Sequence, residues 1–425
     1  MGGATVLSRA DGDLIAFTSE RDGNADVSVM NADGSEHTNI SRHPRRGERP
    51  TLMPGPTMNV RFGRACLVAT VLGLAACSVG EDQASEQAQL ASGGALPKSC
   101  ATGNVPADAT ASFVAGGRAW ALEPETGRLT CLFSVRDAGP FVWGPRGDRA
   151  LLARLEVKGL GDAPSRPPGR ADPDASSWGR PNGKSIVFVG KGGRALLKAH
   201  PAGGGFTDVT PVQGATYERV TYHPSGLAFA FVLRRHGLAS IWISSNVGKT
   251  PRQFVHGRLH TGFDAISFGD GGSQLYFAAR HVDNRVDVHR LQLVGATSAP
   301  VVWRGGPEER VTDLVDAPGG VDLAFTAGRS CDSRYAVVVS ARHPKGAELM
   351  PDESRSRAVG WLDRKHVLVA TGGCGQKLDL YSVEAATLEA RLLVRAVDAA
   401  SVRRAEQYPP PPLSPAVLGA RSSFA

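Results

Sequence analysis

Few residues in this 425-residue sequence stand at the spacings that catalysis or metal binding requires. It contains no Gly-x-Ser-x-Gly motif, no phosphate-binding glycine loop and no His-Glu-x-x-His motif. The 11 histidines are scattered, although His256, His260 and His281 could face one loop surface and offer imidazoles to a metal ion. His223 lies in a Pro-Ser-Gly turn, where a structural role is expected. We therefore predict no catalytic residue, no metal site and no cofactor.

Cys77 has the most specific chemical context. Residues 58–80 read MNVRFGRACLVATVLGLAACSVG, in which two arginines precede an apolar run at 65–76. A short positive segment, an apolar run and small residues are typical of a secretory signal peptide. Residues 74–77 (LAAC) resemble a bacterial lipobox, which implies that 58–76 are removed and that Cys77 is lipidated. The alternative is a short core strand with a buried cysteine.

The segments on either side of the folded body have the composition of spacers. Residues 77–99 are polar, rich in Gln, Ser and Ala, and lack periodic apolar positions. They are predicted to form a flexible tether with a reach on the order of 25 Å. Residues 409–425 begin with four prolines and are predicted to be a disordered tail. This tail is a terminal spacer or, alternatively, a docking peptide for an envelope partner.

Residues 1–57 precede the signal peptide and yet contain a strand pattern. Residues 14–40 read LIAFTSERDGNADVSVMNADGSEHTNI, with strands predicted at 15–18 and 26–31 around a tight turn. This segment closely resembles one repeat of the TolB-like propeller family. A single repeat cannot bury its own faces. We expect an orphan repeat in a mis-assigned N-terminal extension; an uncleaved anchor at 67–79 and a remnant of a fused neighbouring gene are the alternatives.

One pattern recurs from about residue 108 onward: a short strand ending in an anchor, a Gly, Pro, Asp or Asn turn, and a strongly apolar strand. The first anchor spacing is 35 residues and the others are 44–47, which is the length of a four-stranded propeller blade. The blade anchors are Trp143, Trp178, Tyr222, Phe268, Val315 and Trp361.

The strands after the anchors are short and almost continuously apolar, which favours burial on both faces. They are predicted at 185–189, 227–232, 274–278, 321–326 and 366–370, and third strands at 239–244, 286–291, 335–340 and 378–383. These copies resemble TolB-like (WD40-like) repeats, with Pro-Ser-Gly and Pro-Asn-Gly turns where that family usually has Ser-Pro-Asp-Gly. The alternatives are a helical solenoid and a β-sandwich. The solenoid is disfavoured because only 384–394 offers a fair amphipathic helix, and the sandwich because it needs no fixed period of about 45 residues.

These repeats predict an all-β fold over residues 100–408. The fold is a β-propeller of six four-stranded blades, with seven blades left open. Strands at 111–114, 119–123 and 129–135 supply only three strands of the first blade. A strand at 398–405 is predicted to complete this blade and close the ring, since open sheet edges invite aggregation.

Four cysteines remain after Cys66 and Cys77 are assigned to the signal region. Export implies an oxidising compartment, in which an even number of cysteines favours disulfides. Cys331 and Cys374 both follow the second strand of successive blades, so they are predicted to pair on one face of the ring. Cys100 and Cys131 are the second candidate pair, which would join the tether to the first blade.

Charge and composition exclude several classes of protein. The net charge is +7, but the basic residues are interleaved with acidic ones, so we predict no nucleic-acid partner. The 41% hydrophobic content excludes global disorder, and the longest apolar runs are too short for a polytopic membrane protein.

The sequence therefore predicts an exported, lipid-anchored propeller on the periplasmic or cell-surface side of a membrane. In the TolB-like family the propeller binds partners, and that resemblance implies a non-catalytic scaffold for an envelope protein, peptide or polymer. The membrane contact is expected through the lipid anchor only. The alternative is an enzyme, such as a polysaccharide lyase or hydrolase, with its site in the central funnel. The identity of the partner and the oligomeric state stay open.

Overall fold

The computed structural model describes four strands between residues 6 and 39, Leu96, and residues 105–136, 139, 141–152, 156–159, 175–179, 182–256, 260–269, 271–294, 298–320, 322–353 and 355–403. The predicted signal peptide (58–76), Cys77, the tether apart from Leu96, and the tail at 409–425 lie outside the described residues. The chain divides into two compact units, Met1–Ala75 and Ala76–Ala425, which are described separately.

The first unit contains one antiparallel sheet in the order β1-β2-β3-β4. Its strands are β1 Val6–Ser8, β2 Leu14–Ser19, β3 Asp26–Asn31 and β4 Thr38–Asn39. The two strands predicted in this segment are therefore present, as β2 and β3. They have the four-stranded meander connectivity of a propeller blade.

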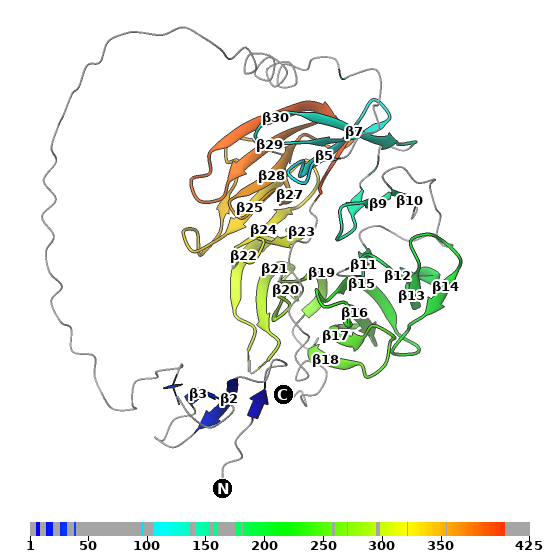
Figure 1. Ribbon diagram of the computed structural model, residues 1–425, viewed down its shortest axis with the longest axis vertical. Coiled ribbons are helices and arrows are strands. Elements are labelled where there is room, and N and C mark those ends of the chain that lie inside the picture. Colours follow the sequence, from blue (N-terminus) through cyan, green and yellow to red (C-terminus); the bar gives the residue numbers. More distant parts are fainter. Residues whose placement is uncertain are drawn as a thin grey trace, which may run out of the picture. The chain divides into compact units, whose positions relative to one another are not determined.

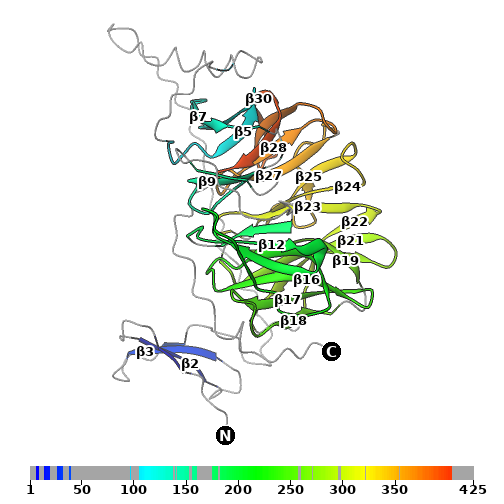
Figure 2. The same cartoon turned by 90° about the vertical axis from the view of Figure 1, so that its right-hand side faces the viewer.

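The second unit is a β-propeller, and its described residues form seven sheets arranged as blades around a ring (Figures 1 and 2). Within each blade, the strands that follow one another in sequence pair antiparallel, and one connection then leads to the next blade. The first blade consists of β31 Ala399–Val402, β5 Ala111–Ala115, β6 Arg118–Leu122 and β7 Leu129–Ser134. The second has three described strands, β8 Val142–Trp143, β9 Arg149–Leu152 and β10 Glu156–Gly159.

The other five blades each have four strands in sequence order. The third and fourth blades are β11 Ser176–Trp178, β12 Ile186–Gly190, β13 Ala195–Ala199, β14 Phe206–Asp208, and β15 Thr216–Tyr222, β16 Ala228–Arg235, β17 Leu238–Ser245, β18 Arg252–Val255. A short 3-10 turn, Lys191–Gly193, joins β12 to β13.

The fifth, sixth and seventh blades complete the ring. They are β19 His260–Phe268, β20 Gln274–His281, β21 Arg285–Gln292, β22 Val301–Pro307; β23 Arg310–Asp316, β24 Leu323–Gly328, β25 Arg334–Val339, β26 Ala347–Glu348; and β27 Ser356–Trp361, β28 His366–Thr371, β29 Leu378–Glu384, β30 Ala390–Val397.

The sequence left six and seven blades open and favoured six, whereas the ring has seven. The short 35-residue spacing had favoured six blades with an inserted hairpin. Instead, the strands β8, β9 and β10 form a separate thin sheet. Leu151 and Val157 of this sheet pack with Trp178 and Phe188 of the third blade. These three short strands therefore form a blade of their own.

Ring closure follows the prediction. Strand β31 pairs with β5 in antiparallel register, from Ala399 opposite Val114 to Val402 opposite Ala111. The orange strands of the last blade consequently lie beside the cyan strands of the first (Figure 1). Residues 384–394, the fair helix candidate, form a turn and the start of β30 instead.

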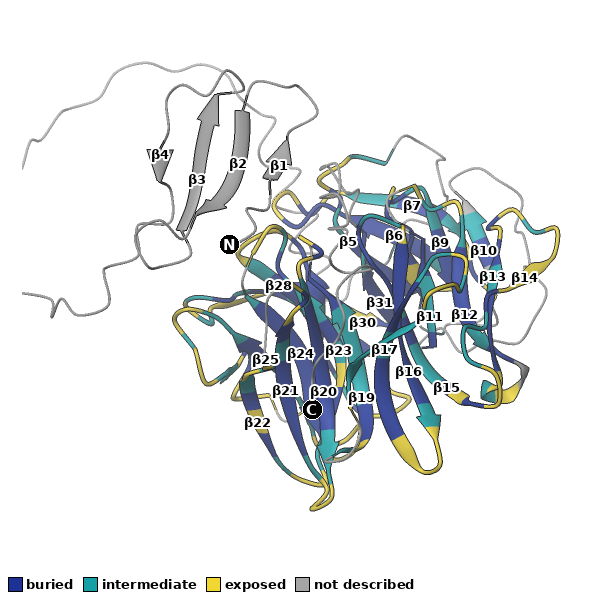
Figure 3. Cartoon of the chain, turned by 90° about the horizontal axis from the view of Figure 1, so that it is seen from below, coloured by how far each residue is buried: buried dark blue, intermediate teal, exposed yellow. Residues whose placement is uncertain are grey.

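The core lies between neighbouring blades. The second and third strands of each blade are the most deeply buried, and exposed residues gather at the hairpin turns (Figure 3). Residues Ala228–Leu233 of β16, for example, are all buried, and Phe229 and Phe231 pack against Tyr217 and Tyr222 of the same blade. Each fully buried large side chain stabilises the fold by about 1.5–3 kcal/mol. Among the described residues, no helix is long and apolar enough to cross a membrane.

Candidate functional site

A channel runs through the ring between the first strands of its blades. It has a volume of about 660 Å³ and is lined by residues of β31, β8, β11, β15, β19, β23 and β27, by the residues on either side of β8, and by Arg334 of β25. The first strands of neighbouring blades lie side by side around it. Since the blades repeat one connectivity, these strands run in the same direction along the channel. Channels of this kind, enclosed by a rigid scaffold, are common places for ligands.

The predicted blade anchors lie at the end of the channel where the first strands finish. Trp143, Trp178, Tyr222, Phe268 and Trp361 are the last residues of their strands, and Val315 is the last but one of β23. The five aromatic side chains are buried.

The anchor tryptophans also join neighbouring blades through their indole nitrogens. Trp178 Nε1 donates to the carbonyl of Val142 at 3.2 Å, and Trp361 Nε1 donates to the carbonyl of Val315 at 3.2 Å. Their role in the structure is therefore packing and blade-to-blade hydrogen bonding.

Four of the first strands contain β-bulges before their last residue. Register shifts interrupt β15 at Tyr217/Arg219, β19 at Phe263/Ala265, β23 at Thr312/Val315 and β27 at Ala358/Gly360. A bulge inserts an extra residue and re-aims the side chains around it. Three charged residues of the channel lining, Arg219, Asp264 and Asp313, lie at these shifts.

We define the charged mouth as Arg219, Asp264, Asp313, Arg334 and Arg357, which all line the channel. Asp264 forms an ion pair with Arg280 of the neighbouring strand, so its charge is compensated within the blade. Arg219 Nε donates to the backbone carbonyl of Asp264 at 3.1 Å, which links the fourth and fifth blades.

Asp313 sits between two arginines of the sixth and seventh blades. Arg357 Nε lies 3.6 Å from Asp313 Oδ2, and the hydroxyl of Thr326 donates to the same oxygen at 2.9 Å. Asp313 has a φ of 53°, a left-handed conformation that few non-glycine residues adopt. Such strained residues gather at functional sites.

Arg334 and Arg357 are partly buried cations without full compensation. Burial and the positive charge of Arg357 lower the pKa of Arg334. The Nε atoms of both arginines are buried and have no hydrogen-bond partner. A guanidinium group presents a planar fork of donors that fits a carboxylate or phosphate. The charged mouth is therefore suited to an anionic group.

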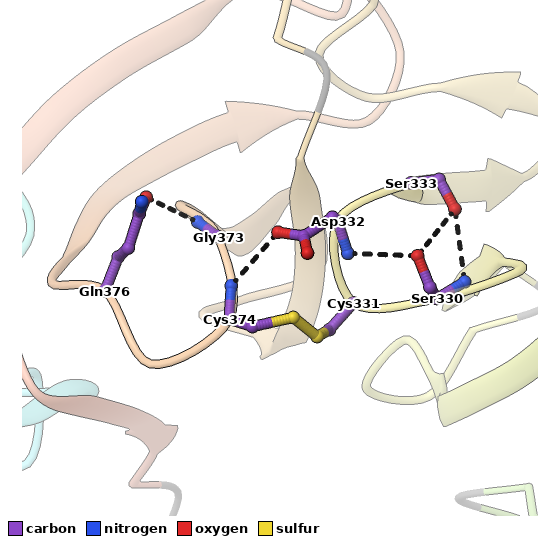
Figure 4. The surroundings of a disulfide bond; sticks show 7 residues. All are labelled: Ser330, Cys331, Asp332, Ser333, Gly373, Cys374 and Gln376. Carbon is purple, nitrogen blue, oxygen red and sulfur yellow. Dashed lines mark hydrogen bonds between the residues drawn. A yellow bond between two sulfur atoms is a disulfide. The ribbon is translucent and has the colours of Figure 1, made fainter.

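The predicted disulfide between Cys331 and Cys374 is present (Figure 4). It joins the loop after β24 to the loop after β28, with the two Cα atoms 5.6 Å apart. Asp332 Oδ1 accepts a hydrogen bond from the Cys374 backbone N–H at 3.3 Å. Cys131 is also disulfide-bonded; Cys100 lies outside the described residues, so its pairing stays a prediction.

His223 occupies a structural position between the fourth and fifth blades. It is 2% exposed, and its Nδ1 accepts a hydrogen bond from the Ser225 backbone N–H at 3.1 Å. Its proton therefore sits on Nε2, which lies 2.8 Å from the carbonyl of Gly272 and donates to it. Both ring nitrogens are occupied, so this imidazole is a neutral link between blades.

Two of the three histidines that the sequence grouped lie together. The ring centroids of His260 and His281 are 5.1 Å apart, whereas His256 is exposed after β18. None of the described residues that line the channel is a histidine. The charged mouth was not predicted from the sequence. A signal was present, because Asp313 and Arg357 are charged residues within the short strands that end at the anchors Val315 and Trp361.

Comparisons with known proteins concern the fold. No protein-family model matches the sequence, and no curated protein is significantly similar to it. The structure resembles a puromycin-hydrolysing peptidase from Mycobacterium tuberculosis, with 17% identity over 68% of this chain and 54% of that chain and a TM-score of 0.47. The chain thus spans about half the length of that peptidase.

Two further similar structures are described as TolB. One, from Acinetobacter baumannii, is 11% identical over 94% of this chain and 82% of that chain, with a TM-score of 0.41. The other, from Agrobacterium tumefaciens, is 14% identical over 69% of this chain and 98% of that chain, also with a TM-score of 0.41. The protein is a seven-bladed β-propeller in fold, a conclusion that the blade topology itself carries.

Proposed function

We propose that this protein is an exported, lipid-anchored scaffold that binds an acidic segment of an envelope protein, peptide or polymer at the charged mouth. The observation that carries the proposal is the pair of partly buried arginines, Arg334 and Arg357, whose Nε atoms lack hydrogen-bond partners beside the channel. Guanidinium forks in a site shielded from water favour carboxylate ligands strongly.

Two observations support the extracytoplasmic location. Residues 58–77 have the order of a lipoprotein signal, with Cys77 as the acylated residue. The disulfide between Cys331 and Cys374 belongs to an oxidising compartment, because thiols are kept reduced in most cytosols. Several acyl chains together anchor a protein stably, whereas one chain gives only marginal binding.

The location is tested by intact-mass analysis of the protein extracted from membranes of its native host. The expected mature chain begins at Cys77 and carries diacylglycerol and an acylated amine. The Cys77→Ser variant is expected to lose the lipid mass and to leave the membrane fraction. A membrane-extracted chain that retains residues 1–76 would contradict lipid anchoring.

The binding site is tested with a fluorescent peptide of repeated glutamates and a glutamine peptide of the same length. We expect the glutamate peptide alone to bind, and to bind more weakly as salt is raised. The double variant Arg334→Gln/Arg357→Gln is expected to weaken binding at least tenfold, because truncating one partner of a buried charge pair costs about 2–5 kcal/mol.

The matched control is Arg235→Gln, which removes a positive charge at an exposed hairpin position. Its binding should equal that of the unchanged protein. Equal losses in the control and the double variant would mean that the peptide responds to net charge rather than to the charged mouth.

An enzyme with its site in the channel is the second candidate. It is favoured by the carboxylates Asp264 and Asp313, which lie beside arginines in the same channel. Incubation with acidic envelope polysaccharides decides between the two functions. Turnover of a glycan that is lost in Asp313→Asn would overturn the scaffold proposal.

A further inference from the structure

A group of three histidines and one aspartate lies in the fifth blade, apart from the channel lining. His260 begins β19, His281 ends β20, and Asp287 and His289 are alternate residues of β21. His260 pairs with His281 across the first two strands, while Asp287 and His289 pair with Ala279 and Phe277 of β20. Since side chains alternate between the faces of a sheet, all four project from the same face. This is the face that packs with the fourth blade through Phe277 and Ala279.

His289 is oriented like a metal ligand. Its Nδ1 lies 3.0 Å from the carbonyl of Ala299, so Nδ1 carries the proton and Nε2 has a free lone pair. That Nε2 is buried and has no hydrogen-bond partner. The ring stacks on Phe277 with centroids 4.9 Å apart and an interplanar angle of 6°. A backbone carbonyl that accepts from the other ring nitrogen, and so fixes the tautomer and orientation of the ring, is typical of metal-binding histidines.

Asp287 supplies a buried negative charge with poor compensation. Its side chain is 3% exposed, and Oδ1 has no hydrogen-bond partner. Arg285 Nε is 3.5 Å away, and this contact satisfies neither group as a hydrogen bond. A buried carboxylate is costly unless it is paired or coordinates a metal.

The spacing of the ligand atoms fits a small cation. His281 Nε2 and Asp287 Oδ2 are 3.3 Å apart, without a hydrogen bond from that nitrogen. Tetrahedral zinc with bonds of about 2.0–2.1 Å holds its ligand atoms roughly 3.3–3.4 Å apart. One ligand atom each from His281, Asp287 and His289 lies within 4.8 Å of the others. Small side-chain adjustments would therefore complete the coordination.

His260 lies beside two of these three residues. Its ring centroid lies 5.1 Å from that of His281 and 6.0 Å from that of His289, and its Nδ1 is buried without a partner.

We propose that His281 Nε2, the Asp287 carboxylate and His289 Nε2 bind a divalent transition-metal ion of the zinc class, with His260 as the fourth ligand. Imidazole and carboxylate ligands in this number suit zinc better than calcium, which prefers six to eight oxygens. The site is separate from the charged mouth and does not rest on the proposed function. Bound metal would tie the first three strands of the fifth blade together.

The test begins with the full chain stripped of metal by a chelator and titrated with zinc, followed by metal analysis after dialysis. No reductant is present, so Cys331 and Cys374 stay joined and offer no thiolate. We expect one zinc per chain and a metal-dependent rise in melting temperature. Titration with cobalt is expected to give the visible spectrum of a four-coordinate nitrogen and oxygen site, which requires no variant.

Variants then assign the ligands. His281→Gln and His289→Gln should each weaken zinc binding at least a hundredfold, whereas His366→Gln, outside this group, should leave it unchanged. Arg285→Ala should strengthen binding, because it removes a cation that competes for Asp287; its side chain is 38% exposed, so folding should tolerate the change.

Two results would overturn the proposal. One is no stoichiometric binding of zinc or cobalt by the unchanged chain. The other is full binding by His281→Gln and His289→Gln. In either case the group acts as a structural ion pair between His281, Asp287 and Arg285.

Discussion

Buried tyrosines give this protein a specific weakness toward alkali. Tyr276 is 2% exposed, and its hydroxyl donates to Gln274 Oε1 at 2.8 Å. Burial, reinforced by Asp316, raises its pKa to about 12. Burial also raises the pKa of Tyr335, whose hydroxyl donates to Glu309 Oε1 at 2.8 Å. Both phenols are held in the neutral form by their surroundings.

We expect the free energy of unfolding to fall as the pH rises above about 10. In this window the unfolded tyrosines lose their protons while folded Tyr276 keeps its own up to about pH 12, so unfolding is favoured. Denaturant midpoints measured from pH 8 to 11 check this. Tyr276→Phe, which cannot ionise, should show a shallower fall, and curves that run parallel to the unchanged protein would contradict the assignment.

At the scale of strands and loops, the disulfide is a covalent link between two blades that otherwise meet through packing, hydrogen bonds and an ion pair. Cys331 and Cys374 are 43 residues apart in sequence, and each lies in the loop between the second and third strands of its blade. Crosslinking a loop of this length stabilises a fold by about 4 kcal/mol, mainly through the unfolded chain.

The double variant Cys331→Ser/Cys374→Ser should therefore lose about 2–4 kcal/mol of stability without reductant, as measured by chemical denaturation. Reductant should lower the stability of the unchanged protein by at least this amount, because Cys131 is also disulfide-bonded. Indistinguishable denaturation curves for the variant and the unchanged protein would show that the bond does not constrain the unfolded chain.

Strands could be predicted from the sequence, whereas the groups of side chains that meet across strands could not. The buried second strands, such as β16 and β28, were predictable because continuous hydrophobicity marks a strand packed on both faces. The charged mouth could not be predicted in this way, because bulges such as that at Thr312/Val315 change which side chains face the channel. The grouping of His281 with Asp287 and His289 depends on cross-strand register, which the sequence of one strand does not contain.

At the scale of the whole ring, closure depends on β31 and the residue after it. Trp143 Nε1 donates to Ser112 Oγ at 2.7 Å, and Ser112 Oγ donates to the carbonyl of Ser401 at 2.7 Å. Arg403 is buried, donates from Nε to the Gly147 carbonyl at 2.8 Å and lies over the Trp143 ring. These contacts join the first blade, the second blade and the closing strand.

Removing residues 399–425 should abolish cooperative unfolding and cause aggregation, because it exposes β5 as an open edge in the first blade. Removing only residues 404–425 leaves β31 and Arg403 in place and should change stability by less than about 1 kcal/mol. Size-exclusion chromatography and thermal unfolding of both chains check this. A monomeric, cooperatively folding chain without residues 399–425 would contradict the closure argument.

The pairing of β31 with β5 also affects when the ring can fold. Ser112 and Ser401 are hydrogen-bonded across 289 residues of chain, so the first blade lacks its inner strand until almost the whole polypeptide has been synthesised. Contacts this distant in sequence slow folding. Until β31 has been made, the edge of β5 is open, and the nascent chain needs protection from aggregation for that time.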